Sequence, residues 1–500
     1  MGLDELRSEI DRADKDLIDA FERRMRAAAK IAAYKKENGL PVLDAKREET
    51  VLARVTANCD AALAPYAQRL YRTLFCLSRE YQTALLAKTG LIGHPLGHSC
   101  SPQLHALYGD TGYQLWDTAP DALDDFLQKR DFDLANVTIP YKQTVLPYCD
   151  TLSDTARGVG SVNTLICRDG RLHGDNTDVW GFQMLAQRMH IDLSLGKTLI
   201  LGSGGASRAV RYAVEQAGGE AVVISRTGEN NYTNIKKHAD ARWIINATPV
   251  GMYPNFDGSL IDLADFPCLA GVLDAIYNPL RTPLVQQAQA RGIPAAGGLY
   301  MLCGQAARAR QLLSGTLPDT DAAYRTLLGQ RLGIALIGMP GAGKSTLARS
   351  LAKHLPLNCI DTDDEIVRRA GQSIPEFFES RGEAAFRDLE SQVIAECSGT
   401  CGQIIAAGGG AVLRAENRRH LRQNCLTVWV QRDLSALPLA GRPVSRSCGS
   451  LQALYDARAP LYAACADVIV SNNGTIEACT REILEKYSRA IACAPCLPAE

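Results

Sequence analysis

The stretch Gly338-Met-Pro-Gly-Ala-Gly-Lys-Ser345 decides the fold of the last third of the chain, because it fits the pattern G-x-x-x-x-G-K-S/T. It follows the apolar run Ile334–Ile337, and leucines at helical spacing come after it. A strand, a glycine-rich loop and a helix in this order let backbone N–H groups surround phosphate oxygens. The sequence therefore predicts an α/β domain that binds ATP and Mg²⁺. The expected contacts are Gly341, Gly343, Lys344, Ser345 and Thr346, with the Ser345 hydroxyl also on Mg²⁺.

Charged and glycine-rich segments follow this phosphate-binding loop. Asp361 and Asp363 end a predicted second strand, so one carboxylate can order a metal shell while the other orients an attacking hydroxyl. The turn Gly408–Gly410 ends another apolar run and offers bare backbone to a flat ring. Each further arginine is a weak signal by itself, because an exposed arginine is usually only solvated. These arginines are Arg387, Arg442 and Arg458.

In this order, the segments over residues 331–488 resemble shikimate kinase. The resemblance implies that Asp363 polarises the shikimate hydroxyl and that Arg387 and Arg458 clamp the carboxylate. It also implies that the shikimate ring lies against the backbone of Gly408, Gly409 and Gly410.

The same resemblance gives Asp361 a role in supporting Mg²⁺ through water, and it makes Arg442 a lid cation near the transferred phosphoryl group. The chain departs from the family between Leu434 and Gly441. This lid segment is short and lacks an arginine often found against adenine, so the departure concerns nucleotide affinity more than substrate identity.

Length and composition set the broad class. Five hundred residues suggest about three or four domains, and 22% charged residues with a net charge of −1 leave no global basic field for nucleic acid or a membrane. No apolar run is long enough to span a bilayer. The 16 cysteines lack the spacing of a disulfide-stapled secreted module, and an acidic N-terminus enters a helix at once, so we expect a cytoplasmic protein. Cys493-Ala-Pro-Cys496 has dithiol spacing, but a frayed tail over residues 489–500 is the better interpretation.

A second glycine-rich segment, Gly202-Ser-Gly-Gly-Ala-Ser207, follows the apolar run Thr198–Leu201 and leads into a helix. This is the fingerprint of a dinucleotide-binding Rossmann unit. The next predicted strand, Ala221–Ile224, ends in an arginine where an acidic residue would bind the ribose of NAD, which favours NADP. The alternative is that this arginine only faces water. The expected NADP contacts are Gly202, Gly204, Gly205, Ala206, Ser207, Ser225, Arg226 and Thr227.

Polar residues upstream of this fingerprint suit reduction of a carbonyl group. Ser99 and Ser101 offer hydroxyl donors for a carboxylate, Asn163 offers an amide, and Lys142 follows a predicted strand. With Asp178, the lysine forms a pair that can exchange a proton with the carbonyl oxygen while carbon receives a hydride.

Residues 89–330 resemble shikimate dehydrogenase, with a substrate half over about 89–193, an NADP half over about 194–297, and C-terminal helices to 330. The resemblance implies that Lys142 and Asp178 are the catalytic pair acting on 3-dehydroshikimate. Ser99 and Ser101 would then bind the substrate carboxylate. The ring hydroxyls would be held by Thr138, Asn163 and Gln305, with Tyr277 as a further contact.

The dehydrogenase segment has one departure from its family. Between Thr227 and Asn246 it lacks about one strand–helix unit of the usual cofactor half, whereas Asn246–Met252 matches the turn under the nicotinamide. A competing interpretation is a quinate dehydrogenase or another two-domain reductase. The paired hydroxyls of Ser99 and Ser101 favour shikimate, and Arg226 favours NADP.

The first ninety residues predict three helices, over Leu3–Glu37, Asp44–Asn58 and Pro65–Leu86. A unit of this size buries little core alone, so a dimer is expected. Arg24 and Lys35 are eleven residues apart, about three helical turns, and therefore share a face. From composition alone, the alternative interpretation is that these charged side chains are only solvated.

The polar residues of this region nevertheless resemble an all-helical chorismate mutase over residues 1–88. The resemblance implies that Arg7, Arg24 and Arg47 bind carboxylates, that Lys35 and Gln82 address the ether oxygen, and that Glu48 binds the ring hydroxyl. Fixed charges suffice for this pericyclic rearrangement. The matching residues are Arg7, Arg24, Lys35, Asp44, Arg47, Glu48, Ser78 and Gln82.

The sequence thus predicts one chain with three activities: chorismate mutase, NADP-dependent shikimate dehydrogenase and shikimate kinase. An alternative keeps only the last two and makes the helical domain a dimerisation module that senses chorismate or prephenate. Arg7 and Arg24 lie about 25 Å apart along one straight helix at ~1.5 Å per residue, so the sequence also predicts a mutase site shared between two chains.

Overall fold

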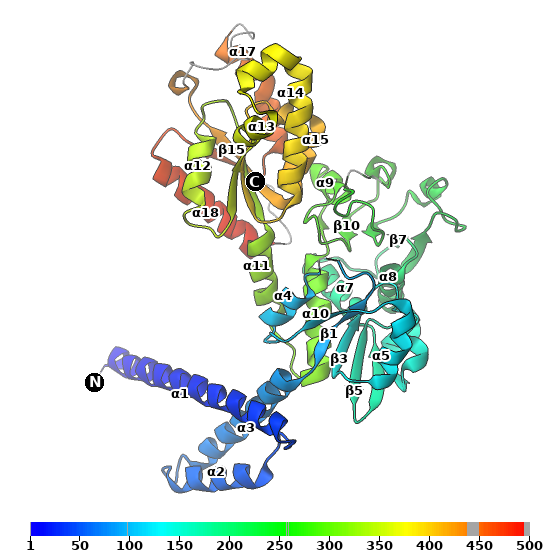
Figure 1. Ribbon diagram of the computed structural model, residues 1–500, viewed down its shortest axis with the longest axis vertical. Coiled ribbons are helices and arrows are strands. Elements are labelled where there is room, and N and C mark those ends of the chain that lie inside the picture. The colour runs from blue at the N-terminus through cyan, green and yellow to red at the C-terminus, as the bar shows by residue number, and fades with distance from the viewer. Residues whose placement is uncertain (1, 98, 257, 259, 438–449, 495–500) are drawn as a thin grey trace. The chain divides into compact units, whose positions relative to one another are not determined.

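The computed structural model describes residues 2–97, 99–256, 258, 260–437 and 450–494 (Figure 1). They form two compact units, one of residues 1–177 with 306–319, and one of residues 178–305 with 320–500. Among the described helices, none combines the length and the apolar composition that crossing a bilayer requires. The cysteines within the described ranges carry free thiols.

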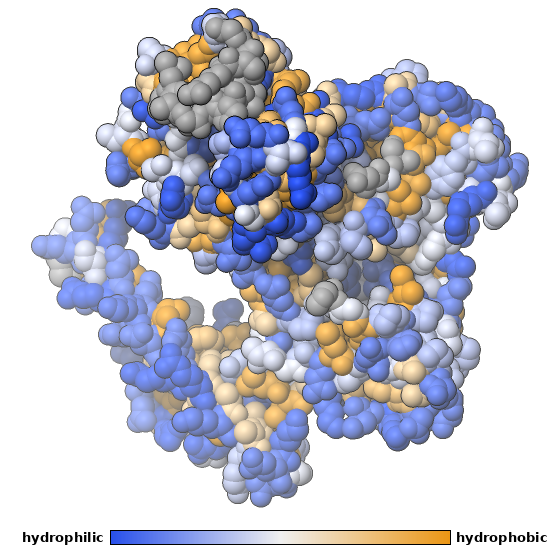
Figure 2. Space-filling view, turned by 45° about the horizontal axis from the view of Figure 1, so that its top comes forward, coloured by the Kyte–Doolittle hydropathy of each residue, from blue (hydrophilic) through white to orange (hydrophobic). Residues whose placement is uncertain are grey.

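The first unit opens with the three helices that the sequence predicts. They are α1 (Leu3–Glu37), α2 (Ala45–Ala57) and α3 (Ala64–Leu86). The Asp44 side chain caps α2 by accepting a hydrogen bond from the backbone N–H of Arg47, at 3.0 Å. The core between the helices is thin, with Ala28, Ala32 and Phe75 as its buried apolar residues. Apolar residues interrupt the polar surface of this helical region in Figure 2.

The rest of the first unit is built on a six-stranded mixed sheet in the order β2-β1-β3-β5-β6-β4. Its strands are β1 (Thr89–Gly93), β2 (Gln114–Asp117), β3 (Leu134–Val137), β4 (Thr151–Leu152), β5 (Thr164–Arg168) and β6 (Arg171–Asp175). β1 and β3 run parallel, while β5 runs antiparallel to β3 and to β6. The carboxyl ends of β1, β3 and β6 therefore share one edge of the sheet. Three short helices accompany it: α4 (Ser101–Leu107), α5 (Leu123–Lys129) and α6 (Asp154–Val159).

The second unit begins with α7 (Thr177–Arg188) and a five-stranded parallel sheet in the order β11-β10-β9-β7-β8. Its strands are β7 (Lys197–Leu201), β8 (Glu220–Ile224), β9 (Trp243–Asn246), β10 (Gly271–Asp274) and β11 (Ala295–Ala296). The helices of this part are α8 (Gly205–Gln216), α9 (Pro283–Ala290) and the first half of α10 (Leu299–Ser314), which belongs to this unit up to Gln305. Between β8 and β9, a segment that the structure describes throughout, the chain forms the short 3-10 turn Ile235–His238 and no further strand–helix unit.

A second parallel sheet, in the order β13-β14-β12-β15-β16, follows α11 (Thr320–Arg331) almost without a linker. Its strands are β12 (Gly333–Ile337), β13 (Asn358–Asp361), β14 (Gln403–Ala406), β15 (Cys425–Gln431) and β16 (Val468–Ser471). The helices around it are α12 (Lys344–Leu351), α13 (Thr362–Ala370), α14 (Ile374–Gly399), α15 (Ala415–Asn424), α17 (Leu451–Cys465) and α18 (Ile476–Cys493). These strand and loop positions match the α/β arrangement predicted from the sequence.

Two details differ from the sequence prediction. The α18 helix continues to Cys493, and Ala494 is buried, so residues 489–494 belong to the fold rather than to a frayed tail. The buried Tyr487 and Ala490 of this helix continue its apolar face up to that point. The α14 helix is interrupted at Gly382, whose φ of 78° lies in the left-handed region that glycine adopts without strain.

Candidate active sites

The phosphate-binding loop has the geometry that its sequence predicts. Gly338, Gly341 and Gly343 have φ values of 144°, 85° and 94°, a range that residues with a side chain rarely adopt. Gly343 precedes α12 and gives the helix no side-chain cap, so its first N–H groups point to where an anion would bind. The Lys344 ammonium donates to the carbonyls of Gly338 and Met339, both at 3.0 Å. Ser345 and Thr346 follow it in the first turn of α12.

Two aspartates meet at the start of α13. The Asp361 carboxylate caps the helix by accepting from the backbone N–H of Asp363, at 3.0 Å. Burial and the negative charge of Asp361 raise the pKa of Asp363, although Lys344 and Arg387 act in the opposite direction. Asp363 therefore lies within electrostatic reach of both cations and is a stronger proton acceptor than an exposed aspartate.

The glycine turn after β14 is packed against charged side chains, so no larger residue fits. A Cβ at Gly408 would lie 2.7 Å from Oδ1 of Asp363 and 3.0 Å from Oε1 of Glu390. A Cβ at Gly410 would overlap the guanidinium of Arg387.

The middle glycine of this turn is held by its backbone. The carbonyl of Gly409 accepts hydrogen bonds from Nη1 of Arg458 at 2.9 Å and from the hydroxyl of Tyr462 at 2.6 Å. The fold therefore brings two residues that were predicted to bind substrate, Gly409 and Arg458, into direct contact.

Arg387 is a buried cation with an incomplete set of partners. It pairs with Glu390 at 2.7 Å and with Glu383 at 3.3 Å. Its buried Nε has no hydrogen-bond partner among the described residues. Because an unsatisfied buried donor costs free energy, this atom fits a bound carboxylate.

The dinucleotide loop after β7 fits a pyrophosphate. Gly202 has a φ of 106°, and a Cβ there would lie 2.8 Å from Cγ2 of Thr248. Gly204 precedes α8 without a side-chain cap, and the space where its Cβ would stand is open. Gly205 and Ala206 then open the helix, and Ser207 is buried in its first turn. Free N–H groups at an open helix start bind phosphate.

The segment after β8 presents the predicted arginine to solvent. Ser225 shapes the turn by accepting a hydrogen bond from the N–H of Gly228, at 2.8 Å. Arg226 and Thr227 are exposed. Burial raises the pKa of Tyr232, and the nearby charge of Arg226 opposes that increase.

A buried carboxylate that the sequence did not single out joins the turns after β9 and β10. Both oxygens of Asp274 accept from the amide of Asn246 at 3.1 Å, and Oδ2 accepts from the hydroxyl of Thr282 at 2.7 Å. Asn246 in turn accepts from the backbone and hydroxyl of Thr248, at 3.0 and 2.7 Å. Burial raises the pKa of Asp274 to about 6, although its hydrogen bonds favour ionisation.

In the first unit, the predicted substrate residues gather at one edge of the mixed sheet. Ser99 and Ser101 follow β1, and their hydroxyls lie 3.1 Å apart. Thr138 and Lys142 follow β3. Asn163 precedes β5 and bonds to Thr177, the first residue of α7.

The remaining dehydrogenase candidates belong to the second unit. Asp178 lies on α7 and Gln305 on α10, and these helices pack so closely that a Cβ on Gly181 would stand 2.9 Å from the backbone nitrogen of Gln305. Tyr277 follows β10, with the Arg331 guanidinium 5.7 Å from the centroid of its ring.

Several mutase candidates converge on α3. Arg24 donates to the carbonyl of Leu74 at 3.3 Å and lies 5.8 Å from the centroid of the Phe75 ring. One turn further, the amide nitrogen of Gln82 lies 3.3 Å from the hydroxyl of Ser78, and both residues are buried.

Glu48 of α2 reaches the same helix through an ion pair with Arg79 at 2.5 Å. Lys35 donates to the carbonyl of Val42 at 2.6 Å, and Arg47 is exposed. Arg7 is separate from this group: it is exposed and pairs with Asp4 at 3.5 Å, near the start of the unbroken α1 helix.

Comparisons with known proteins agree with this division. Family descriptions match at three places: chorismate mutase type II at residues 6–83, the substrate-binding domain of shikimate dehydrogenase at 91–165, and shikimate kinase at 340–488. The shikimate dehydrogenase (NADP(+)) of Clostridium perfringens is 32% identical over 252 residues, which are 46% of this chain and 93% of that protein. The corresponding protein of Thermus thermophilus is 35% identical over 48% of this chain and 99% of its own length.

The chain belongs to the shikimate dehydrogenase family.

A solved structure, a chorismate mutase/shikimate 5-dehydrogenase fusion protein from Clostridium acetobutylicum, is 31% identical over 48% of this chain and 97% of its own, with a TM-score of 0.46. The shikimate dehydrogenase of this chain carries a chorismate mutase domain before it and a shikimate kinase domain after it. The prediction of a trifunctional enzyme of the shikimate pathway is confirmed, and a helical domain that only senses ligands is not favoured.

Sequence reasoning missed several side chains beside these sites. Glu390 and Tyr462 line the glycine turn, and Arg79 pairs with Glu48. Asn472, directly after β16, donates to the carbonyl of Ala342 at 2.7 Å and supports the phosphate-binding loop. A polar residue immediately after a buried parallel strand was the available signal. Arg442 lies outside the described residues, as does most of the lid after Ala436.

Proposed function

We propose that the chain catalyses three reactions with the residues predicted from its sequence. These are the rearrangement of chorismate to prephenate, the NADPH-dependent reduction of 3-dehydroshikimate to shikimate, and the ATP-dependent phosphorylation of shikimate to shikimate 3-phosphate. The observation that supports the proposal best is the cluster of Asp363, Arg387 and Glu390 around the turn Gly408–Gly410, beside a phosphate-binding loop.

In the kinase, the carboxylate of shikimate would satisfy the free Nε of Arg387, with Arg458 as the second cation. The bare turn Gly408–Gly410 would lie against the ring. Asp363 would then accept the proton of the attacking hydroxyl, since its pKa is raised by burial and by Asp361. The loop from Gly341 to Thr346 would hold the phosphates of ATP. Mg²⁺, when bound, stabilises the phosphate charge; the Ser345 hydroxyl would hold it, and the Asp361 carboxylate would support it through water.

In the dehydrogenase, the loop Gly202–Ser207 would bind the pyrophosphate of NADP, and Ser225, Arg226 and Thr227 would bind the ribose phosphate. NADPH, when bound, supplies the hydride. Lys142 and Asp178 would be the catalytic pair that delivers a proton to the carbonyl oxygen. The substrate would be held by Ser99, Ser101, Thr138, Asn163, Tyr277 and Gln305.

In the mutase, Arg24 and Arg47 would bind carboxylates, Lys35 and Gln82 would stabilise the ether oxygen, and Glu48 would bind the ring hydroxyl. Asp44 and Ser78 would support this site. The third carboxylate-binding residue, Arg7, is seventeen residues from Arg24 on the unbroken α1 helix, about 25 Å at ~1.5 Å per residue.

We therefore propose a homodimer in which Arg7 serves the mutase site of the partner protomer. The exposed apolar residues of α1 support this arrangement, because a second helix would bury them. They are Leu3, Leu6, Ile10, Leu17 and Ile18.

The proposed domains are residues 1–88 for the mutase, 89–330 for the dehydrogenase and 331–488 for the kinase. Support comes from helix and strand ends: α3 ends at Leu86 before β1 begins at Thr89, and α11 ends at Arg331 before β12 begins at Gly333. The free thiols are consistent with a cytoplasmic location, where thiols stay reduced.

The first test is to assay all three reactions on one purified preparation. Chorismate consumption, NADP reduction by shikimate, and ATP-dependent phosphorylation of shikimate are all expected. Absence of chorismate consumption in a folded dimer would instead favour the sensing module.

The second test addresses the shared mutase site. Arg7→Ala and Arg24→Ala should each be inactive, but mixed dimers of the two would hold one site with both lesions and one with neither. Mutase activity should therefore partly return after chain exchange. If labelled chains exchange and no activity returns, or if the active protein is a monomer, the shared site is wrong.

A further inference from the structure

The turns that follow β9 and β10 of the NADP half pack directly against the kinase, and both lie in the second unit. The main joint is Arg281, whose two terminal nitrogens lie 2.7 and 2.9 Å from the two carboxylate oxygens of Asp467. Arg281 also donates to the carbonyl of Cys425, and its backbone N–H donates to the carbonyl of Gln423 at 2.9 Å. Next to it, the N–H of Leu280 donates to Oδ1 of Asn424 at 2.9 Å.

This ion pair is buried and well supplied with partners. The side chains of Arg281 and Asp467 are 7% and 11% exposed. Asp467 also accepts from the backbone and hydroxyl of Thr427, at 2.9 and 2.8 Å. Burial opposes ionisation of Asp467, but the charges of Arg281 and Arg422 and the hydrogen bonds from Arg281 and Thr427 together outweigh it, so the pKa of Asp467 lies below its ordinary value. Arg422 is a second cation at 3.7 Å from Oδ1 of Asp467. Removal of Arg281 or Asp467 still leaves a buried charge without its close, hydrogen-bonded partner, which is destabilising locally.

Further contacts tie the same two turns to the kinase. The Phe256 ring meets the His420 ring edge-on at a centroid distance of 4.8 Å, and the Tyr253 ring lies 3.3 Å from the Cβ position of Gly399. After β10, Tyr277 is covered by the guanidinium of Arg331.

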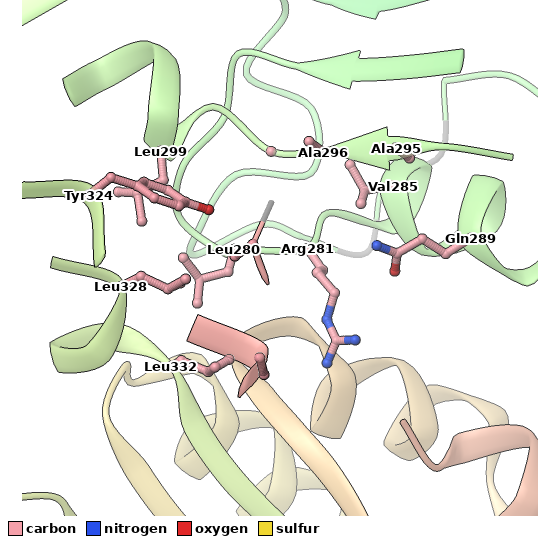
Figure 3. Close-up of a pocket in the computed structure, with 13 residues that line it drawn as sticks. Leu280, Arg281, Val285, Gln289, Ala295, Ala296, Leu299, Tyr324, Leu328 and Leu332 are labelled. Carbon is pink, nitrogen blue, oxygen red and sulfur yellow. The ribbon is translucent and has the colours of Figure 1, made fainter. Parts of the chain in front are cut away.

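The contact between the NADP half and the kinase is packed and encloses little empty space. A cavity of about 60 Å³ remains between α9, α11 and α18, which is room for water but not for a substrate. Figure 3 shows Leu280, Leu328 and Leu332 lining one side of the cavity, and Arg281 extending away from its turn toward the pale orange helices of the kinase.

We propose that the kinase domain holds the turn Tyr277–Thr282 in the position that the dehydrogenase reaction needs, with Arg281 and Asp467 as positioning residues. The turn carries Tyr277 at one end and Thr282 at the other, and Thr282 bonds to Asp274, which orients Asn246 and the turn under the nicotinamide. A displaced Arg281 would therefore move both Tyr277 and, through Thr282 and Asp274, the turn at Asn246. The inference rests on the proposed roles of Tyr277 and of the Asn246 turn.

The kinase site lies at the other end of its own sheet, so kinase activity is an internal control. Cys425 begins β15 and Asp467 directly precedes β16, whereas the phosphate-binding loop follows the carboxyl end of the parallel strand β12. The seven-residue strand β15 spans roughly 20 Å at ~3.3 Å per residue, which is about the distance between the two ends of this sheet.

The experiment uses the full chain with Arg281→Met, Arg281→Lys and Asp467→Asn, and with Lys236→Ala as a matched control. Lys236 makes an ion pair with Asp265 at 2.9 Å, and both residues belong to the NADP half. Steady-state kinetics of shikimate oxidation and of shikimate phosphorylation are measured on each, together with hydrogen exchange of the peptide over residues 276–286.

We expect Arg281→Met and Asp467→Asn to lower kcat/KM of the dehydrogenase by about tenfold or more, mainly through KM for shikimate, since small displacements of positioning groups have effects of up to ~10²-fold. Peptide 276–286 should exchange faster, and Arg281→Lys should recover part of both. Kinase kinetics and Lys236→Ala should match the unmutated chain.

Unchanged dehydrogenase kinetics in Arg281→Met and Asp467→Asn would overturn the inference. The inference would also be overturned if Arg281→Met lowered dehydrogenase and kinase activity equally and Arg281→Lys recovered neither. The ion pair would then serve folding alone. Absence of dehydrogenase activity in the unmutated chain would instead contradict the proposed function.

Discussion

Gly181 offers a direct test of how the dehydrogenase site is assembled, because it lies where α7 crosses α10. A Cβ at this position would lie 2.9 Å from the backbone nitrogen of Gln305 and closer still to the carbonyl oxygen of Met301. Gly304 is its counterpart: a Cβ there would lie 3.1 Å from Cα of Gly181. Gly181→Ala should therefore force apart the two helices that carry Asp178 and Gln305.

The size of the effect follows from these contacts. A separation of 2.9 Å must grow to about 3.4 Å to become an ordinary contact, so the helices must move by at least ~0.5 Å. Overpacking of this kind costs about 1–3 kcal/mol. Asp178 lies three residues before Gly181 on the same helix face, and a displacement of ~1 Å in a reacting group can lower the rate up to ~10²-fold.

We expect kcat/KM for NADP reduction by shikimate to fall about tenfold to a hundredfold. The melting temperature should fall by about 2–4 °C per kcal/mol lost. Kinase and mutase rates, measured at 25 °C on the same preparation, should be unchanged. The control is Gly329→Ala in α11, where a Cβ would meet Cδ1 of Ile491 at 3.5 Å, an ordinary contact.

Gly329→Ala should be neutral or stabilise the protein by about 0.5–1 kcal/mol, because alanine is the better helix former. The reasoning is refuted if Gly181→Ala keeps both the dehydrogenase efficiency and the melting temperature of the unmutated chain. It is also refuted if the two alanine variants lose the same amount.

Three further predictions follow from the other sites. Lys344→Ala should abolish phosphorylation of shikimate and leave NADP reduction near the unmutated rate, and loss of both in a folded variant would contradict independent sites. Arg226→Ala should raise KM for NADP far more than for NAD, since only NADP carries the ribose phosphate, and equal use of both by the unmutated enzyme would count against this role. Burial raises the pKa of Asp274 from 3.8 to about 6, so the folded state binds its proton more tightly than the unfolded state. The contribution of Asp274 to stability should therefore decline as pH rises from about 4 to about 6, by roughly 3 kcal/mol at ~1.4 kcal/mol per pKa unit, and the difference between the unfolding curves of the unmutated chain and Asp274→Asn should show this slope.

Much of the fold could be read from local patterns. The segments Gly338–Ser345 and Gly202–Ser207 each specify a strand, a turn and a helix start, because left-handed glycines and an open helix N-terminus are properties of neighbouring residues. The unbroken helix Leu3–Glu37 follows from its periodicity and from the absence of glycine and proline within it.

The sites were predictable only where family resemblance connected distant residues. Arg387 was predicted to be a substrate cation, but its buried partner Glu390 was not singled out, since an i,i+3 pair on a helix is usually a surface feature. Asp274 was missed for a related reason: an aspartate at the end of a strand becomes informative only when the three donors that surround it are known.

The sequence by itself determined the order of the three domains and the two phosphate-binding loops, because these depend on residues close together in the chain. Only the tertiary structure decided which distant charges meet. Arg281 and Asp467 are 186 residues apart, and their pairing makes the kinase a support for the dehydrogenase. The physical reason is that burial turns a pair of ordinary charges into a strong and specific contact, and burial is a property of the packed molecule rather than of the chain.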